Sequence, residues 1–168
     1  MFTTKRLRKA TLVLLLFAVP CALAQPIDMV RDAELFMPVE GVDLSQVSDT
    51  WCAARSEGRS HEGVDIFAPE GTAVYSATAG YVEWIGPYGI GGNTITVVGA
   101  GRVRYYYAHL SGYADDLVNG QAVTTETLLG YVGSTGNAST TPPHLHLGVY
   151  TGFWDAENPY PLLVDRSW

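Results

Sequence analysis

The segment that decides the fold reads PPHLHLGVY and occupies residues 142–150. In an extended strand, alternate side chains point to the same side. Leu145, Leu147 and Val149 therefore predict a face that packs on a core, and His144 and His146 share the opposite face. The preceding Pro-Pro pair is rigid and marks the entry to the strand. The segment predicts a half-buried β-strand that presents two histidines on one side.

Short runs of the same kind follow one another from about Trp51 onward, separated by Gly, Pro, Asn and Ser. Such separators are typical of turns, and several short strands at close spacing predict a mainly β, compact antiparallel fold. Two short helices are also expected, at residues 28–36 before Pro38 and at residues 113–118 before Asn119-Gly120. The predicted strands cover residues 63–67, 73–77, 81–86, 94–98, 103–109, 128–132 and 144–150.

Composition excludes several classes of protein. The chain has 168 residues, 17 acidic and 10 basic, and a net charge of −7, whereas a nucleic-acid binder normally carries a basic face. A hydrophobic fraction of 47% with 16% charged residues excludes intrinsic disorder. Two cysteines are too few for a disulfide framework or a cysteine-rich zinc module. The length suits one domain with a short appendage.

Residues 1–24 have the layout of a secretory signal peptide. Four basic residues at positions 5–9 precede an apolar run at 11–22, and Ala22-Leu23-Ala24 is a small-residue cleavage site. The alternatives are a transmembrane anchor, for which the run is short and broken by Pro20, and a lipoprotein signal at Cys21. Cleavage would leave 6 basic and 17 acidic residues, a net charge of −11. We therefore expect an exported protein, periplasmic or secreted, without stable membrane insertion.

The rest of the chain divides into three parts. Residues 25–50 form an N-terminal segment that precedes or packs on the domain, and the sequence leaves open whether it covers a groove. Residues 51–150 form the domain, and residues 151–168 form a C-terminal tail packed on it. Cys52, the one cysteine left after cleavage, is expected to be a small buried residue beside Trp51, with a reactive thiol as the alternative.

All four histidines lie in the β region. If residues 60–65 are extended, His61 and Asp65 share a face, with Glu62 and Val64 opposite, and an imidazole with a carboxylate suits zinc. Taken alone, this pair is equally consistent with a surface histidine that lies beside an acidic residue. His109 would share a face with Tyr105 and Tyr107 at the end of its strand.

Taken together, the histidines and Asp65 fit one site. Three protein ligands with one open position is the usual catalytic zinc arrangement. His61, Asp65 and one histidine of the 144/146 pair would supply the ligands. The other histidine of the pair and His109 would remain as acid/base groups, because an unperturbed imidazole, with a pKa of about 6.5, suits proton transfer.

Three blocks of sequence resemble the lysostaphin-like (LytM-type) zinc endopeptidases. They occur in that family's order and cover about residues 51–150. The first comprises HEGVD at 61–65, APEGTAV at 68–74 and GYV at 80–82; the second is YAHL at 107–110; the third comprises GYVGSTGN at 130–137 and PHLHL at 143–147.

The resemblance implies a role for each residue. His61, Asp65 and His146 match the ligands of one Zn²⁺, and His109 and His144 match the two catalytic histidines. It also implies a groove across the sheet and, as substrates, the peptides of bacterial peptidoglycan, either glycine bridges or the D-Ala–diaminopimelate cross-link. Arg55 lies where family members carry a residue near the site, and it is a candidate stabiliser of the substrate carbonyl.

These observations lead to a zinc-dependent endopeptidase that acts as a monomer on peptidoglycan peptides and binds no nucleic acid. Two alternatives stay open. One is a non-catalytic regulator of the same fold that activates a partner cell-wall hydrolase. The other is a β-rich binding module in which the histidines are incidental.

Overall fold

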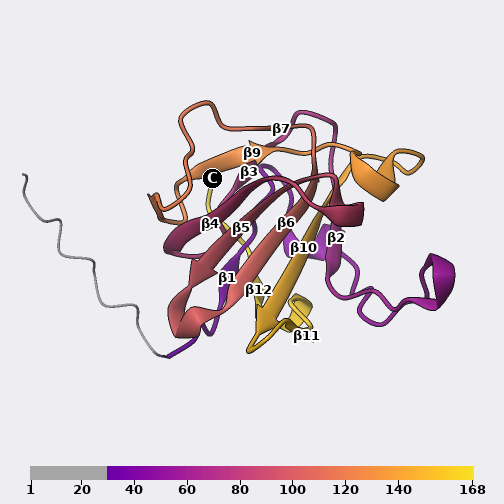
Figure 1. Cartoon of the computed structure of the whole chain (residues 1–168), viewed down its shortest axis with the longest axis horizontal. Coiled ribbons are helices and arrows are strands. Elements are labelled where there is room, and N and C mark those ends of the chain that lie inside the picture. The colour runs from indigo at the N-terminus through magenta and orange to yellow at the C-terminus, as the bar shows by residue number, and fades with distance from the viewer. Residues whose placement is uncertain (1–29) are drawn as a thin grey trace, which may run out of the picture.

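The computed structural model describes residues 30–168 (Figure 1). The signal segment predicted at residues 1–24 lies outside the described residues. Among those described, no helix is long and apolar enough to cross a membrane. The described helical segments are all three-residue 3-10 turns: η1 (Leu44–Gln46), η2 (Ser56–Gly58), η3 (Gly89–Gly91), η4 (Ala100–Arg102), η5 (Gly136–Ala138) and η6 (Tyr160–Leu162).

The prediction of a mainly β, antiparallel fold is confirmed. Each predicted strand is present: β2 (Val64–Phe67), β3 (Ala73–Tyr75), β4 (Gly80–Pro87), β5 (Asn93–Gly99), β6 (Arg104–Leu110), β9 (Leu128–Tyr131) and β10 (His144–Thr151). The sequence did not indicate five shorter strands: β1 (Leu35–Phe36), β7 (Gly112–Tyr113), β8 (Ala122–Val123), β11 (Asp155–Glu157) and β12 (Leu163–Val164).

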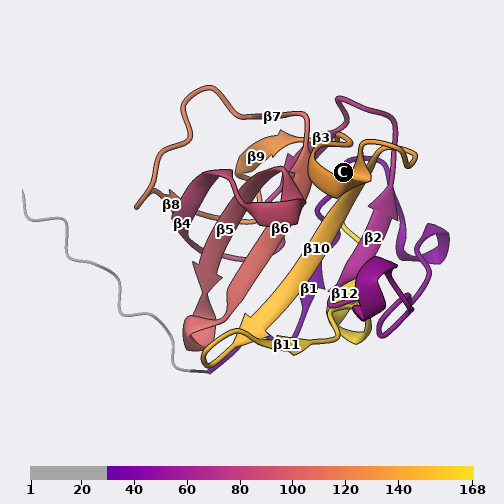
Figure 2. The same ribbon diagram turned by 45° about the vertical axis from the view of Figure 1, so that its right-hand side comes forward.

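The main sheet has seven strands and is built around β10. Its order is β11-β10-β6-β5-β4-β8, and β2 also pairs with β10. One edge of β10 pairs with β6, while the other pairs with β2 over its first half and with β11 over its second half. A three-stranded sheet, β3-β9-β7, and the parallel pair β1-β12 complete the fold. In Figures 1 and 2, β1 and β12 pass behind the main sheet, and its other side stays open.

Alternation along the central strands sends one set of side chains into the core. Leu145, Leu147 and Val149 are fully buried, as predicted, and Tyr105 and Tyr107 join them. The two buried phenols are satisfied because the Tyr105 hydroxyl donates to Asp32 Oδ2 at 2.9 Å and the Tyr107 hydroxyl accepts the N–H of Ala77 at 2.9 Å. The histidines of β10 therefore lie on the open side.

The N-terminal segment and the C-terminal tail pack on the same core. Leu35, Met37 and Val39 are fully buried in it. The buried Arg166 donates to the carbonyls of Met37 and Ser76, at 3.0 and 2.9 Å, and to that of Thr125. The Arg166 side chain therefore links the C-terminal tail to the N-terminal segment and to the loop before β9. Each carbonyl that it satisfies would otherwise be a buried polar group without a partner.

Both predicted helices are wrong. Residues 30–36 contain no helix, because Leu35 and Phe36 pair with β12 and the Phe36 N–H donates to the Ala77 carbonyl at 3.0 Å. Residues 113–118 continue from β7 into a turn, because the Ala114 N–H donates to the Leu129 carbonyl at 2.9 Å. In both places long-range strand pairing overrides local propensity.

The expectation of a buried Cys52 is also wrong. The residue is exposed and sits in a turn with φ of 60°. Its backbone N–H donates to the His61 carbonyl at 3.0 Å, so that the backbone faces the protein and the thiol faces outward.

Candidate metal centre

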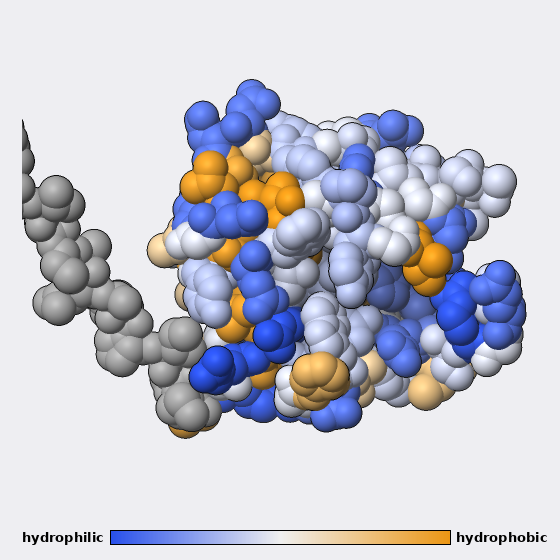
Figure 3. All heavy atoms as spheres, viewed as in Figure 1, coloured by the Kyte–Doolittle hydropathy of each residue, from blue (hydrophilic) through white to orange (hydrophobic). Residues whose placement is uncertain are grey.

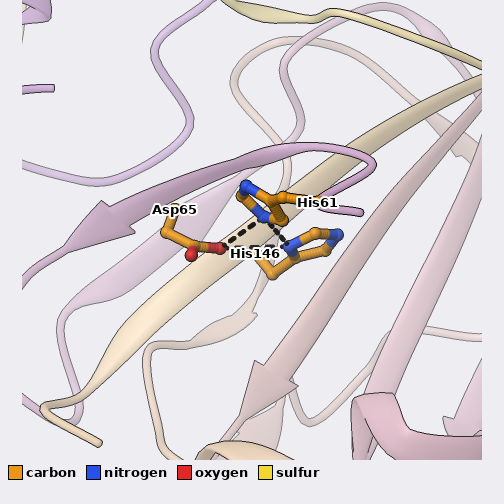
Figure 4. Close-up of side chains that lie close together, drawn as sticks. All are labelled: His61, Asp65 and His146. Carbon is orange, nitrogen blue, oxygen red and sulfur yellow. Dashed lines mark hydrogen bonds and ion pairs between the residues drawn. The ribbon is translucent and has the colours of Figure 1, made fainter. Parts of the chain in front are cut away.

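Three side chains from two distant parts of the chain converge on the open side of the sheet. His61 Nε2 lies 3.0 Å from Asp65 Oδ1 and 3.0 Å from His146 Nδ1, and the third side of the triangle, His146 Nδ1 to Asp65 Oδ1, is 3.1 Å. Figure 4 shows the three groups facing one another. Their ligand atoms could hold one metal ion.

Strand pairing and a short loop position these groups. Asp65 on β2 is the register partner of His146 on β10, so the two side chains stand side by side on one face. His61 precedes the strand, which begins only at Val64, and its backbone is fixed by bonds to Ala53 and Cys52 at 2.9 and 3.0 Å. The predicted meeting of His61 and Asp65 is present, but a loop rather than an extended strand produces it, and Glu62 lines the same cavity instead of facing away.

The hydrogen bonds behind the cluster turn lone pairs toward its centre. His61 Nδ1 lies 3.0 Å from the Thr50 carbonyl, which can only accept, so Nδ1 carries the hydrogen and Nε2 presents its lone pair. Burial alone would raise the pKa of Asp65, but the imidazoles of His146 and His61 beside it favour the ionised carboxylate and hold the pKa well below its usual range. An ionised carboxylate and imidazole lone pairs at this spacing repel one another unless a cation or a proton lies between them.

The donor set fits a zinc ion. Ligands that lie about 2.0–2.2 Å from a tetrahedral zinc are separated from one another by about 3.3–3.6 Å. The observed separations of 3.0–3.1 Å require an outward shift of only a few tenths of an ångström. Two neutral imidazoles and one carboxylate leave one tetrahedral position open, which is the pattern of a catalytic rather than a structural site.

Two further histidines lie beside the cluster with one nitrogen free. His109 Nδ1 donates to the Thr135 carbonyl at 2.9 Å, and His144 Nδ1 donates to the Pro142 carbonyl at 2.8 Å. Both bonds leave Nε2 unprotonated in the neutral ring. The two rings stand edge to face, with centroids 5.0 Å apart, and the His109 ring is 5.9 Å from that of His146. The pair could therefore accept and return protons at one position.

The predicted orientation of His109 is wrong. Tyr105 and Tyr107 point into the core, so strict alternation would bury His109 with them. Between Asn93 and Ile95 of β5, however, the register with β6 shifts by one residue, and His109 adopts a φ of 65°. This β-bulge turns the ring to the open side, beside Ala108.

Burial also sets the charge of His109 and His146. Burial, together with the positive charges that His146 and His144 would carry, lowers the pKa of His109 to about 4. Burial likewise lowers the pKa of His146. Both rings are therefore neutral at neutral pH, the form that accepts a proton or binds a metal.

Arg55 reaches the same cluster from the loop before η2. Its Nη2 is 2.5 Å from Asp65 Oδ2, the carboxylate oxygen that does not face the histidines. The Arg55 side chain is 36% exposed, against 6% for Asp65. The guanidinium thus holds the outer edge of the carboxylate and borders the cavity as well.

All six predicted site residues line one open cavity of about 570 Å³. The predicted groove across the sheet is therefore present, and none of residues 30–50 lines it. The lining consists of Arg55, Arg59, Ser60, His61, Glu62, Asp65, Tyr88, Gly89, Ile90, Gly91, Tyr106, Ala108, His109, Asn137, Ala138, Thr141, His144, His146, Tyr150 and Trp154.

The sequence did not point to the groups that orient the histidines. Thr50, Thr135 and Pro142 act through backbone carbonyls, which every residue has, so residue type carries no sign of them. Gly63 is different, because a glycine inside a predicted strand often marks a close approach. A Cβ on Gly63 would lie 2.6 Å from His146 Cε1 and from the Leu147 carbonyl oxygen.

An open antiparallel sheet that carries two histidines, one aspartate and an open position is the arrangement of a mononuclear metallohydrolase. Residues 59–159 match the model of peptidase family M23. The chain therefore belongs to peptidase family M23, a family of metallopeptidases, and the resemblance to lysostaphin-like enzymes is confirmed.

Individual relatives agree with this assignment. The L-Ala–D-Glu endopeptidase of Bacillus subtilis is 40% identical over 71% of this chain and 39% of its own length. Lysostaphin of Staphylococcus simulans is 36% identical over 66% of this chain and 23% of its own length. The crystallised catalytic domain of lysostaphin superposes with a TM-score of 0.63 at 30% identity, over 70% of this chain and 92% of that one. This chain thus spans well under half the length of these two curated relatives.

Gly63 offers a test of how the site is shaped. In Gly63→Ala the new methyl group must displace the His146 ring or the Leu147 backbone, so we expect the affinity for Zn²⁺ to fall by about tenfold or more, the effect typical of disturbing a ligand's support. Isothermal titration with Zn²⁺ measures the change. Gly112→Ala is the matched control, because nothing lies within 4 Å of its added Cβ. Equal affinity in the two variants would contradict the proposed packing.

Proposed function

We propose that the protein is a zinc-dependent endopeptidase that hydrolyses peptide cross-links of bacterial peptidoglycan. One observation carries the proposal: His61, Asp65 and His146 converge in the same groove in which His109 and His144 each present a free Nε2. A regulator that only binds a partner hydrolase would need neither the ligand triangle nor the two oriented bases.

The names of the relatives support peptidoglycan peptides as the substrate class, but they do not identify which peptide bond is cleaved. Their names specify an L-Ala–D-Glu endopeptidase, a DD-carboxypeptidase/endopeptidase and a glycyl-glycine endopeptidase. These are three different peptide linkages handled by relatives of one domain. We therefore propose peptidoglycan peptides as the substrate and leave the scissile bond to experiment.

The chain's own residues account for binding and proton transfer. A zinc ion held by His61, Asp65 and His146 would supply Lewis acidity that polarises a peptide carbonyl and makes a water molecule acidic near neutral pH. Nε2 of His109 or of His144 accepts a proton from the attacking water, and the protonated ring then donates to the leaving amine. The carbonyls of Thr135 and Pro142 keep both rings in the required tautomer.

Arg55 was predicted to stabilise the substrate carbonyl, and its place in the structure favours a second role. Its ion pair with Asp65 Oδ2 orients the carboxylate, so that Oδ1 faces the histidines. The exposed part of the guanidinium still borders the cavity, within reach of a bound peptide. We propose that Arg55 positions Asp65 and contacts the substrate from its exposed edge.

Cleavage assays on the full chain test the function. We expect purified protein to release peptide fragments from cross-linked muropeptides, to stop when a chelator removes the metal, and to recover when Zn²⁺ is returned. Mass spectrometry of the products identifies the bond. Absence of chelator-sensitive cleavage would refute the enzyme, and cleavage only after a second hydrolase is added would establish the regulator instead.

Two variants distinguish the proposed metal-ligand role of His146 from the proposed acid/base role of His109. His146→Ala should lose zinc and activity together, because one of three ligands is removed. His109→Ala should keep its zinc and lose about 100-fold or more in kcat, the usual contribution of a general base. Elemental analysis and kinetics on the same preparations measure both effects. Equal metal loss in the two variants would show that the roles are assigned wrongly.

We further propose that the protein is exported after cleavage behind Ala24 and acts in the periplasm or outside the cell. The basic, apolar and small-residue regions of positions 1–24 support this proposal. N-terminal sequencing of the protein recovered from the export compartment should begin at Gln25. A sequence that begins at Met1 would instead indicate an uncleaved anchor.

A further inference from the structure

A second hollow continues the groove along the open side of the sheet. It has a volume of about 260 Å³ and is lined by Glu83, Trp84, Tyr88, Thr96 and Trp154. Tyr88 and Trp154 also line the cavity of the metal centre, so the two hollows are adjacent. Figure 3 shows that the middle of this side carries side chains of intermediate hydropathy.

Strand register places Trp84 on the same side as the metal centre. Trp84 of β4 pairs with Thr96 of β5, which pairs in turn with Tyr106 of β6. Tyr106 lines the cavity that holds the histidines. The row from Trp84 to Tyr106 therefore forms a continuous floor that leads away from the histidines.

The Trp84 indole is exposed but held in place. It is 43% exposed, and its Nε1–H donates to the Gly86 carbonyl at 3.3 Å. Gly86 has a φ of 151°, and a Cβ there would lie 3.1 Å from the indole ring, so the ring rests against bare backbone. An aromatic ring fixed in this way can bind a ligand without losing much side-chain entropy.

The Trp154 side chain is held in place by contacts with two neighbouring side chains. It lies in the turn between β10 and β11 with a φ of 68°, a conformation that is costly for a bulky side chain. Its ring packs on Tyr150 at 5.1 Å, and the Arg104 guanidinium lies 5.5 Å from the ring centroid. Strain that is maintained to keep a 42% exposed tryptophan beside a groove points to a binding role.

The charges around the hollow cancel. Arg104 binds Glu83 in a two-bonded pair, with Nε at 2.8 Å and Nη2 at 3.0 Å from the two carboxylate oxygens. What remains is a set of flat aromatic faces from Trp84, Tyr88 and Trp154, which make the lining almost wholly apolar. A pyranose ring matches this surface, because its C–H faces pack on aromatic rings while its hydroxyls point away from them into the solvent. A charged polymer finds no net charge to pair with here.

We propose that this second hollow, the Trp84–Trp154 cleft, binds the glycan part of the substrate, a β-1,4-linked N-acetylhexosamine chain. The proposal rests on the proposed function, because the peptides of peptidoglycan are attached to such a chain. A ligand whose peptide lies at the histidines would then place its sugar on the aromatic rings. The cleft would thereby select peptides that still carry glycan over free peptides.

Binding of the glycan is tested without catalysis. Isothermal titration of the full chain with chitotetraose should show saturable binding that weakens about tenfold or more in Trp84→Ala. Trp84→Phe keeps an aromatic face and should retain part of the affinity, which separates loss of stacking from misfolding. Phe153→Ala is the matched control, because Phe153 is 94% exposed, adjoins Trp154 and lines neither hollow. Absence of binding in the wild type, or equal binding in Trp84→Ala, would overturn the proposal.

Kinetics then separate this inference from the proposed function. With one stem peptide prepared with and without its disaccharide, Trp84→Ala should raise KM about tenfold for the glycosylated form alone. Equal losses on both forms would assign the cleft to a peptide side chain and overturn the glycan proposal. If the wild type cleaves neither form, the proposed function fails, and the chitotetraose titration still decides what the cleft binds.

Discussion

The candidate site depends on the antiparallel pairing of β2 with β10. This pairing places Asp65 opposite His146, and it does so while Leu145 and Leu147 of the same strand are anchored in the core. A slip of one residue would send both histidines of β10 inward and the leucines outward. The hydrophobic face therefore fixes the register, and the register in turn fixes the spacing between two of the three proposed ligands.

Backbone carbonyls, rather than side chains, complete the orientation of the histidines. Thr50, Thr135 and Pro142 each accept a hydrogen from one imidazole Nδ1. Because a carbonyl cannot donate, each ring is held in the tautomer that leaves Nε2 available. Residues outside the strands thus orient three of the four histidines of the candidate site.

Sequence patterns predicted seven of the strands and the six candidate residues that the structure brings together in one groove, but they missed two kinds of feature. The rule that side chains alternate between the two faces of a strand identified β10, because its histidines and leucines alternate strictly along the sequence. The same rule failed at His109, where a bulge with φ of 65° reverses the side, and it could not find β1, whose two residues are held by β12. Such failures occur where long-range pairing decides the backbone, and no local pattern of residue types records that pairing.

Backbone strain coincides with a proposed functional side chain at two places in this fold. His109 and Trp154 both have positive φ, and each side chain lines the groove as a result. A conformation of this kind costs of order 1–3 kcal/mol, so it persists only where surrounding contacts impose it. The Thr135 carbonyl holds one residue, and Tyr150 with Arg104 holds the other. Relaxing either residue to negative φ would favour the backbone but turn the side chain away from the groove. The fold thus gives up stability at two points to keep one proposed proton-transfer group and one proposed sugar contact on the same side of the sheet.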